Sequence, residues 1–97
     1  MKEFDINSLD DVIHGRIRLG IMAFLVGAET TDFSALKTHL GATDGNLSVH
    51  LRKLKEADYV KVEKSFRNRK PLTTITLTTT GRKAFVRYLD SIGKLFS

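Results

Sequence analysis

The stretch Thr43–Asp58, with the sequence TDGNLSVHLRKLKEAD, constrains the fold of this chain more than any other. Leu47, Leu51 and Leu54 recur at intervals of four and three residues, which places them along one stripe of an α-helix. The opposite side is small or polar at its start and cationic towards its end. Such a helix must dock its leucines on a hydrophobic core while its other side faces outwards. We therefore expect the chain to fold around this helix.

The outward side of the helix carries side chains suited to contact with DNA. Small residues permit a close approach, polar groups can hydrogen-bond to base edges, and cations can bind phosphates. We predict that this is a DNA recognition helix. The alternative is an ordinary surface helix whose polar side is only solvated. The side chains concerned are Gly45, Asn46, Ser48, Val49, Arg52 and Lys53.

The net charge of +5 is concentrated in one part of the sequence. Residues 52–70 hold eight of the 16 lysines and arginines but only three of the 11 acidic residues, so they carry the whole excess. A local positive field of this kind favours a polyanionic partner. A basic surface without any partner is the alternative interpretation.

Length and composition restrict the class of protein. A chain of 97 residues suits a single domain over residues 1–97. The absence of cysteine excludes disulfides and thiolate metal sites, and it suits a cytoplasmic location. The most apolar run, Leu19–Ala28, is half of the roughly 20 residues needed to cross a bilayer, so we expect no membrane partner.

The sequence before the recognition helix predicts an arm and two further helices. Residues 1–8 are polar and acidic and should form a flexible arm. Leu9–Gly27 has helical periodicity, with a bend expected near Gly15 or Gly20. A short strand of two or three residues is possible within 28–31. Asp32 and Gly41 are suitable caps for a short helix over Phe33–Leu40, and Thr43 can cap the helix that follows.

The first helix is apolar on two sides and needs two covering surfaces. One is the core of the domain, and the other is the C-terminal helix, a second subunit, or both. The two stripes are Ile13, Ile17, Ile21, Phe24 and Leu25 on one side and Val12, Leu19, Met22 and Val26 on the other. The next two helices, within residues 33–58, form a helix-turn-helix, whose second helix contacts DNA.

After Asp58 the apolar period changes from that of a helix to that of a strand. Val60 and Val62, and later Ile75 and Leu77, alternate with polar residues, which predicts a β-hairpin over 59–77 with the basic segment 65–72 at its tip. A last helix is expected over 78–96, capped by Thr78. The apolar side of this helix must dock on another surface. It consists of Phe85, Tyr88, Leu89, Ile92, Leu95 and Phe96.

This order of elements is that of a winged helix, and the sequence resembles the small winged-helix transcriptional regulators related to the MarR and ArsR groups. The resemblance covers residues 9–95. It rests on IHGRIRLGIMAFL, FSALKTHLGATDGNLSVHLRKLKEADYV, KSFRNRKPLTTITLT and TTTGRKAF. It implies a mainly α (α+β) fold: a winged helix-turn-helix with a two- or three-stranded β-wing and a C-terminal dimerisation helix.

The resemblance also implies a partner, double-stranded DNA, and a homodimer formed through the first and last helices. Two recognition helices would enter successive major grooves, with the wings on the backbone or in the minor groove. The expected DNA contacts in the helix are Thr43, Asn46, Ser48, Val49, Arg52 and Lys53. Those in the wing are Arg67, Asn68, Arg69 and Lys70.

Some of these residues have a second interpretation. Thr43 is first a helix cap, and Asn46 could make only local hydrogen bonds. Asp58 stands where related regulators usually have glycine, and we expect it to adopt the left-handed conformation that this turn requires. The cysteine motif of ArsR metal sensors is absent.

No other chemistry is indicated by the sequence. His14, His39 and His50 lack metal-ligand spacing, and His50 is expected to pack within its helix. No catalytic set can be assembled, so we expect no enzyme activity, no cofactor and no metal. The alternative to DNA binding is a winged-helix protein-interaction module in a larger assembly.

Overall fold

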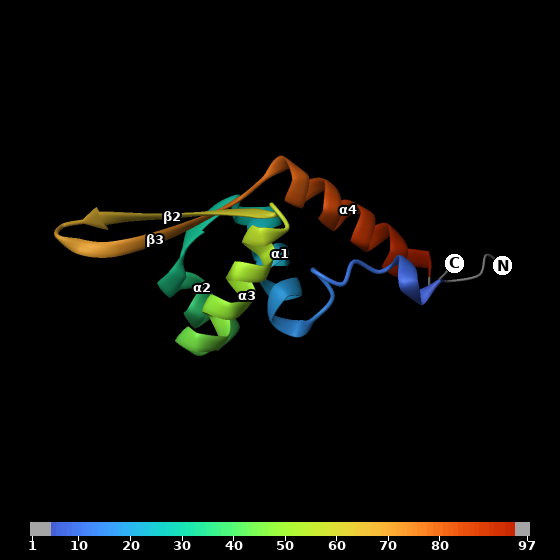
Figure 1. Cartoon of the computed structure of the whole chain (residues 1–97), viewed down its shortest axis with the longest axis horizontal. Coiled ribbons are helices and arrows are strands. Elements are labelled where there is room, and N and C mark those ends of the chain that lie inside the picture. The colour runs from blue at the N-terminus through green and yellow to red at the C-terminus, as the bar shows by residue number, and fades with distance from the viewer. Residues whose placement is uncertain (1–4, 95–97) are drawn as a thin grey trace.

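The computed structural model of the chain describes residues 5–94. The strands form one antiparallel sheet in the order β1–β3–β2. In Figure 1 the β2–β3 hairpin and α4 project in opposite directions from a body that contains α1, α2 and α3. This arrangement confirms the predicted winged-helix α+β fold. The elements are η1 (Ile6–Ser8), α1 (Arg16–Ala28), β1 (Thr30–Asp32), α2 (Phe33–Leu40), α3 (Asp44–Glu56), β2 (Val60–Arg67), β3 (Lys70–Leu77) and α4 (Thr79–Gly93).

The hydrophobic core lies where α1, α2 and α3 meet the sheet. Leu47 and Leu54 of α3 are fully buried and Leu51 is nearly so. Burial of one leucine contributes about 1.5–3 kcal/mol, so the stripe anchors α3 strongly. Met22, on the second apolar stripe of α1, is also fully buried, and therefore part of that stripe is covered within the chain. The other fully buried side chains are Ile13, Ile21, Leu25, Leu36 and Ile75.

Three predicted helix caps are present. Each cap satisfies an amide of the first turn and contributes about 1 kcal/mol. Their side-chain oxygens accept hydrogen bonds at 2.9, 3.2 and 2.8 Å, from Ala35 N to Asp32, from Asn46 N to Thr43 and from Gly81 N to Thr78. The helices that these caps begin start at Phe33, Asp44 and Thr79.

Two residues that follow helices adopt the left-handed conformation, the cap Gly41 and, as predicted, Asp58. Gly41 ends α2 with φ 62°, and Asp58 follows α3 with φ 63°. Helix α3 begins after its cap Thr43 and ends at Glu56, two residues before Asp58.

The prediction of a helix over Leu9–Gly27 is wrong in its first part, because α1 begins only at Arg16. The Asp10 carboxylate accepts hydrogen bonds from the amides of Val12 and Ile13, which favours a turn over a helix. Gly15 has φ 159° and ψ 146°, outside the helical region. Within the predicted arm, Ile6–Ser8 forms a short 3-10 helix, while residues 1–4 lie outside the described part of the chain.

The segment before α1 is held by side chains from distant parts of the chain. Tyr59 donates a hydrogen bond of 2.5 Å to Asp10 Oδ2. Burial, together with this bond, raises the pKa of Tyr59 to about 12. His14 Nδ1 lies 2.9 Å from the hydroxyl of Tyr88 in α4, and Figure 1 shows this segment running beside α4. Residues 9–14 are therefore part of the packed structure.

The basic segment 65–72 lies at the tip of the hairpin, as predicted, and most of it is strand. The pairing of β2 with β3 continues through Phe66 and Pro71 to Arg67 and Lys70. Only Asn68 and Arg69 form the turn, with φ values of 51° and 67°. Positive φ at both central residues is the signature of a tight type I′ hairpin turn, which asparagine favours.

The predicted apolar side of the last helix is covered only in part within the chain. Phe85 and Tyr88 are buried, but Leu89 is 50% exposed and Val86 is 53% exposed. The buried side of α4 is set by the small residues Gly81 and Ala84 together with the two rings, and Leu89 lies beyond it. The predicted members Leu95 and Phe96 lie outside the described residues.

Gly81 permits a close contact between α4 and the turn that joins α3 to β2. A Cβ atom at Gly81 would lie 2.1 Å from the Tyr59 carbonyl oxygen and 3.0 Å from Leu77 Cδ1. Because the first of these atoms belongs to the backbone, no side-chain rotation could relieve the clash. The Thr78 hydroxyl donates to the Asp58 carbonyl oxygen at 2.6 Å and strengthens the same junction.

We predict that Gly81→Ala lowers the free energy of unfolding by about 2 kcal/mol or more, because α4 must shift away from Tyr59. Urea unfolding followed by circular dichroism measures the change. The matched control is Gly27→Ala in α1, where a new Cβ has no neighbour within 4 Å. The control should be neutral or stabilise the protein by up to about 1 kcal/mol. Equal stability of the two variants would contradict the packing described.

Candidate nucleic-acid interface

Helix α3 presents the predicted polar face to solvent. Its leucine stripe is buried, and the opposite side chains are exposed over the whole length of the helix. Exposure is the first condition for contact with a partner, and every predicted contact residue in the helix meets it. These residues are Thr43, Asn46, Ser48, Val49, Arg52 and Lys53.

The N-terminal end of α3 has room for a close partner. Gly45 has no neighbour within 4 Å of where a Cβ would lie. The exposed anion at this end, Asp44, forms an ion pair of 2.7 Å with Lys37 of α2. This pair places a cation beside a carboxylate that would otherwise repel a polyanion. The pair joins the last turn of α2 to the first turn of α3, and no local sequence pattern indicates it.

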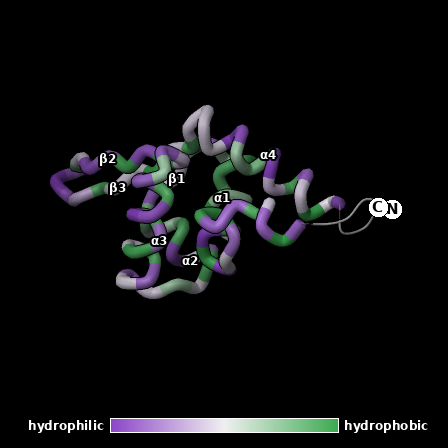
Figure 2. The backbone as a smooth tube through the Cα atoms, turned by 45° about the vertical axis from the view of Figure 1, so that its right-hand side comes forward, coloured by the Kyte–Doolittle hydropathy of each residue, from purple (hydrophilic) through white to green (hydrophobic). Residues whose placement is uncertain are grey.

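The wing carries its cations at and near the turn. Arg67, Asn68, Arg69 and Lys70 are all exposed, and Figure 2 shows hydrophilic colour at the end of the hairpin. No acidic residue lies between Lys64 and Pro71. Arg69 is held at φ 67°, a conformation that costs about 1–2 kcal/mol for a residue with a side chain of this size.

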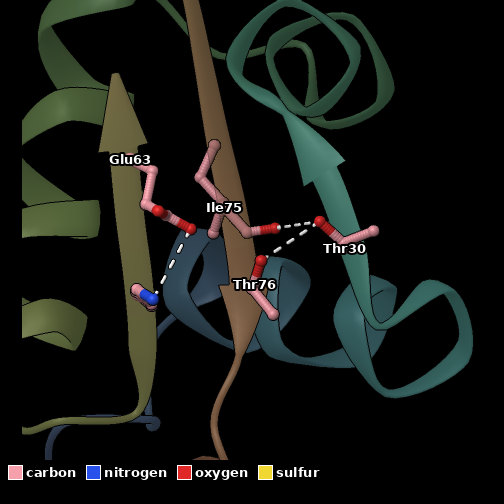
Figure 3. A network of polar contacts seen from close by, with 5 residues as sticks. Thr30, Glu63, Ile75 and Thr76 are labelled. Carbon is pink, nitrogen blue, oxygen red and sulfur yellow. Dashed lines mark hydrogen bonds and ion pairs between the residues drawn. The ribbon is translucent and has the colours of Figure 1, made fainter. Parts of the chain in front are cut away.

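Closer to the body, the wing is anchored to β1 and its charges are balanced. The Thr30 hydroxyl donates to the Ile75 carbonyl oxygen at 3.2 Å and lies 3.2 Å from the Thr76 hydroxyl (Figure 3). On β2, Lys61 pairs with Glu63 at 3.7 Å. The excess positive charge of the wing is therefore carried by its outer part.

A groove of about 450 Å³ separates α3 from the wing. Ser48 and Arg52 lie on its helix side and Lys64 on its wing side. Lys55 joins them because positions 48, 52 and 55 share one face of the helix. Lys55 and Lys64 are additional candidates that the sequence analysis did not single out, although the spacing of Lys55 from Arg52 indicated it. The remaining lining residues are Phe33, Asp44, Leu51, Val62 and Thr73.

Lys53 does not belong to this groove. It borders a separate depression formed with Asp11, Arg18 and Glu56. The structure thus divides the cations of α3 into a set that faces the wing and a single lysine on the side of the N-terminal segment. The turn residues Asn68 and Arg69 do not line the groove either, and they lie beyond it along the hairpin.

Arg18 of α1 connects the N-terminal segment to α3. Its guanidinium donates to the Val12 carbonyl oxygen at 2.6 Å and to His50 Nδ1 at 2.9 Å. Since arginine can only donate, His50 must accept through Nδ1 and carry its proton on Nε2. Burial lowers the pKa of His50, and the charges of Arg18 and Lys53 lower it further. His50 is half-buried, in agreement with the expected packing role.

Comparison with known proteins agrees with the fold. Residues 17–96 match a family model described as a winged helix DNA-binding domain. The chain belongs to this family. This winged-helix chain is 39% identical over 84 residues to an uncharacterized protein of Methanocaldococcus jannaschii, and the match covers 87% of this chain and 91% of that protein.

Solved winged-helix structures are also similar. A transcriptional regulator homologue from Pyrococcus horikoshii superposes with a TM-score of 0.82 at 33% identity, covering 88% of this chain and 84% of that one. Overoxidized AbfR bound to DNA superposes with a TM-score of 0.70 at 21% identity, covering 79% of this chain and 56% of that one. NadR in complex with 4-hydroxyphenylacetate superposes with a TM-score of 0.72 at 19% identity, covering 93% of this chain and 63% of that one. The last two support the fold alone.

The family points to a non-enzymatic, DNA-binding role. Among residues 5–94, no cluster of three or more histidine and acidic side chains is arranged to hold a metal ion. No helix within the same range is long and apolar enough to cross a membrane.

We predict that the protein loses stability as the pH falls from 7 towards 5.5, in part through His50. Its folded-state pKa lies below the ordinary value of 6.5, so the unfolded chain binds a proton that the folded chain does not. The stabilisation is therefore present above pH 6.5 and lost below it. Thermal unfolding at pH 7 and 5.5 should show a smaller loss for His50→Asn, whose amide oxygen can still accept from Arg18.

The control is His39→Asn, which removes an exposed histidine whose ring contacts Phe24 instead. This variant should keep the wild-type pH response. An unchanged response in His50→Asn would show that the contact with Arg18 does not govern the titration.

Proposed function

We propose that the protein binds double-stranded DNA in a sequence-specific manner as a homodimeric transcriptional regulator. The observation that carries this proposal is the outward face of α3, which is mostly polar and cationic, exposed to solvent, and held in place by a buried leucine stripe. An α-helix about 10–12 Å across matches a major groove about 12 Å wide. The wing would lie on the adjacent backbone or in the minor groove.

The two ends of α3 are suited to different contacts. The first turns carry Asn46, Ser48 and Val49, which can meet base edges: an amide suits adenine, and a valine methyl suits the methyl group of thymine. Arg52 lies further along, where it could contact guanine or a phosphate. The hydroxyl of Thr43 is already used as a cap, which supports a structural role for this residue before any contact with DNA.

The cations around the groove would bind the phosphate backbone. Lys55 and Lys64 face each other across it, and the outer wing adds Arg67, Arg69 and Lys70. Such contacts set affinity and register but carry little information about the base sequence. They also make binding dependent on salt, because each neutralised phosphate releases counterions.

The homodimer is supported by apolar surface on α4. Val86 and Leu89 are both about half exposed and lie three residues apart, on the same side of the helix. Paired α4 helices would place two copies of α3 about a two-fold axis, as a near-palindromic DNA site requires. A transcriptional regulator of this kind would act in the cytoplasm.

We predict that Lys53→Ala weakens binding to all DNA sequences alike, whereas Asn46→Ala changes the preferred sequence. Loss of a phosphate contact reduces the slope of log K against log salt by about 0.9, while loss of a base contact does not. The measurement is fluorescence anisotropy on a duplex selected from a random pool and on bulk duplex, at several salt concentrations.

The matched control is Lys83→Ala, which removes an exposed lysine on α4 and should change neither quantity. Wild-type protein without a salt-dependent preference for the selected duplex would overturn the proposed function. It would favour instead a module that binds protein. A Lys53→Ala variant that altered sequence preference at an unchanged slope would overturn the assignment of that residue.

We predict that Leu89→Glu converts the dimer to a monomer at micromolar concentration. The carboxylate would be buried at the α4 contact without a partner, while the isolated chain tolerates it because the site is half exposed. Sedimentation velocity measures the change. Thr38→Glu, which adds the same charge to an exposed site on α2, should remain dimeric. Monomeric wild-type protein would overturn the dimer.

A further inference from the structure

The wing carries an aromatic side chain that the core does not use. Phe66 is 77% exposed, more than any other large hydrophobic residue in the part of the chain that the structure describes. It lies opposite Pro71 in the pairing of β2 with β3, one residue from the last paired position before the turn. Exposure of a phenyl ring to water is unfavourable, and its burial against a partner would recover that free energy.

The surroundings of Phe66 indicate the chemistry of the partner. Residues 64–71 contain four cations and no anion, and the nearest acid on β2, Glu63, is paired with Lys61. A partner that covers the ring must therefore also sit among Lys64, Arg67, Arg69 and Lys70. An apolar protein surface would leave these charges buried and unpaired, at high cost. A nucleic acid offers phosphates for the cations and flat, apolar surface for the ring.

The position of Phe66 along the wing suits one part of a duplex. By the alternation of side chains along a strand, Phe66 follows Val62 and Lys64, which line the groove beside α3. Phe66 itself lies beyond that groove, where it borders a separate shallow depression with Leu72 and Thr74. Phe66 lies four residues beyond Val62, a distance of about 14 Å at about 3.4 Å per residue. Half a turn of DNA, from the major groove to the next minor groove, is about 17 Å. With α3 in the major groove, the ring is therefore within reach of the minor groove.

The structure of the hairpin supports this position. Proline at 71 fixes its own backbone φ and lies directly across from Phe66. The tight turn at Asn68–Arg69 keeps the two strands paired up to the end of the hairpin. The ring therefore stands on a defined support rather than on an irregular loop, which reduces the entropy lost when it binds.

We propose that Phe66 is an apolar wedge that enters the minor groove and opens the stacking of one base step. This inference rests on the proposed function and adds a contact that no cation supplies. The cost of unstacking is smallest at pyrimidine–purine steps, such as TA or CA, so Phe66 would add a preference for such a step at the site of wing contact. Arg67, Arg69 and Lys70 would hold the phosphates on either side.

The test uses the full chain and a duplex selected from a random pool by the wild-type protein. Phe66→Ala should weaken binding about tenfold or more, as loss of an aromatic contact with a base does. The slope of log K against log salt should not change, because no charge is lost. Arg69→Gly is the complementary variant: it removes a cation where glycine is favoured by φ 67°, and it should reduce the slope by about 0.9.

A second measurement reports directly on the wedge. Adenines of the selected duplex are replaced one at a time by 2-aminopurine, whose fluorescence rises when its stacking is lost. Wild-type protein and Phe66→Trp should raise the fluorescence at one step flanking the major-groove site, and Phe66→Ala should not. Thermal unfolding of Phe66→Ala should match that of the wild type, because the ring makes little contact within the chain.

The outcomes separate this inference from the proposed function. Wild-type affinity in Phe66→Ala, or a fluorescence rise that persists in that variant, would overturn the wedge and leave DNA binding intact. A reduced salt slope in Phe66→Ala would also overturn it, because the ring would then only position the cations. If the wild-type protein selected no duplex, the proposed function would fail and the wedge with it.

Discussion

The burial of Leu47, Leu51 and Leu54 is the interaction on which the rest of the structure depends. Helix α3 has only 13 residues, and its outward side begins with glycine, asparagine and serine, which are poor helix formers. A helix this short is marginal in isolation, so its shape is maintained by tertiary packing. The exposed polar face therefore exists in a defined geometry only because the opposite face is buried against α1 and the sheet. The same leucines that stabilise the fold orient the residues proposed to meet DNA.

The wing has a different role from α3, because it holds positive charge at a distance from the body of the domain. A two-stranded ribbon has little apolar surface to bury, and the outer part of this one is held together by backbone pairing up to Arg67 and Lys70. Arginine at position 69 is not the residue that a tight turn favours, since its φ is 67°. Backbone strain of this kind tends to occur at sites that have a function. Together with the exposed Phe66, this strain supports the proposal that the wing contacts DNA.

The parts of the fold that could be predicted from the sequence are those specified locally. Asp32, Thr43 and Thr78 act as caps through amides three residues away, and Asp58 adopts its left-handed conformation within a single turn. Features that join distant residues could not be predicted in this way. The groove that brings Lys64 to Arg52, the Lys37–Asp44 pair and the contact of Arg18 with His50 all depend on how elements pack. The late start of the first helix has both kinds of cause: Asp10 accepts from the nearby amides of Val12 and Ile13, and its other oxygen accepts from Tyr59, 49 residues away.

The junction at Thr78 and Gly81 has a mechanical consequence. The hydroxyl of Thr78 bonds to the carbonyl oxygens of Asp58 and Tyr59, and Gly81 lies directly against Tyr59, so the start of α4 is attached to the turn between α3 and β2. In a dimer paired through α4, this attachment would restrict the distance from the dyad to each α3. An insertion of one base pair between two half-sites rotates one groove by about 35° relative to the other. A protein built in this way would tolerate little variation in the spacing of its operator.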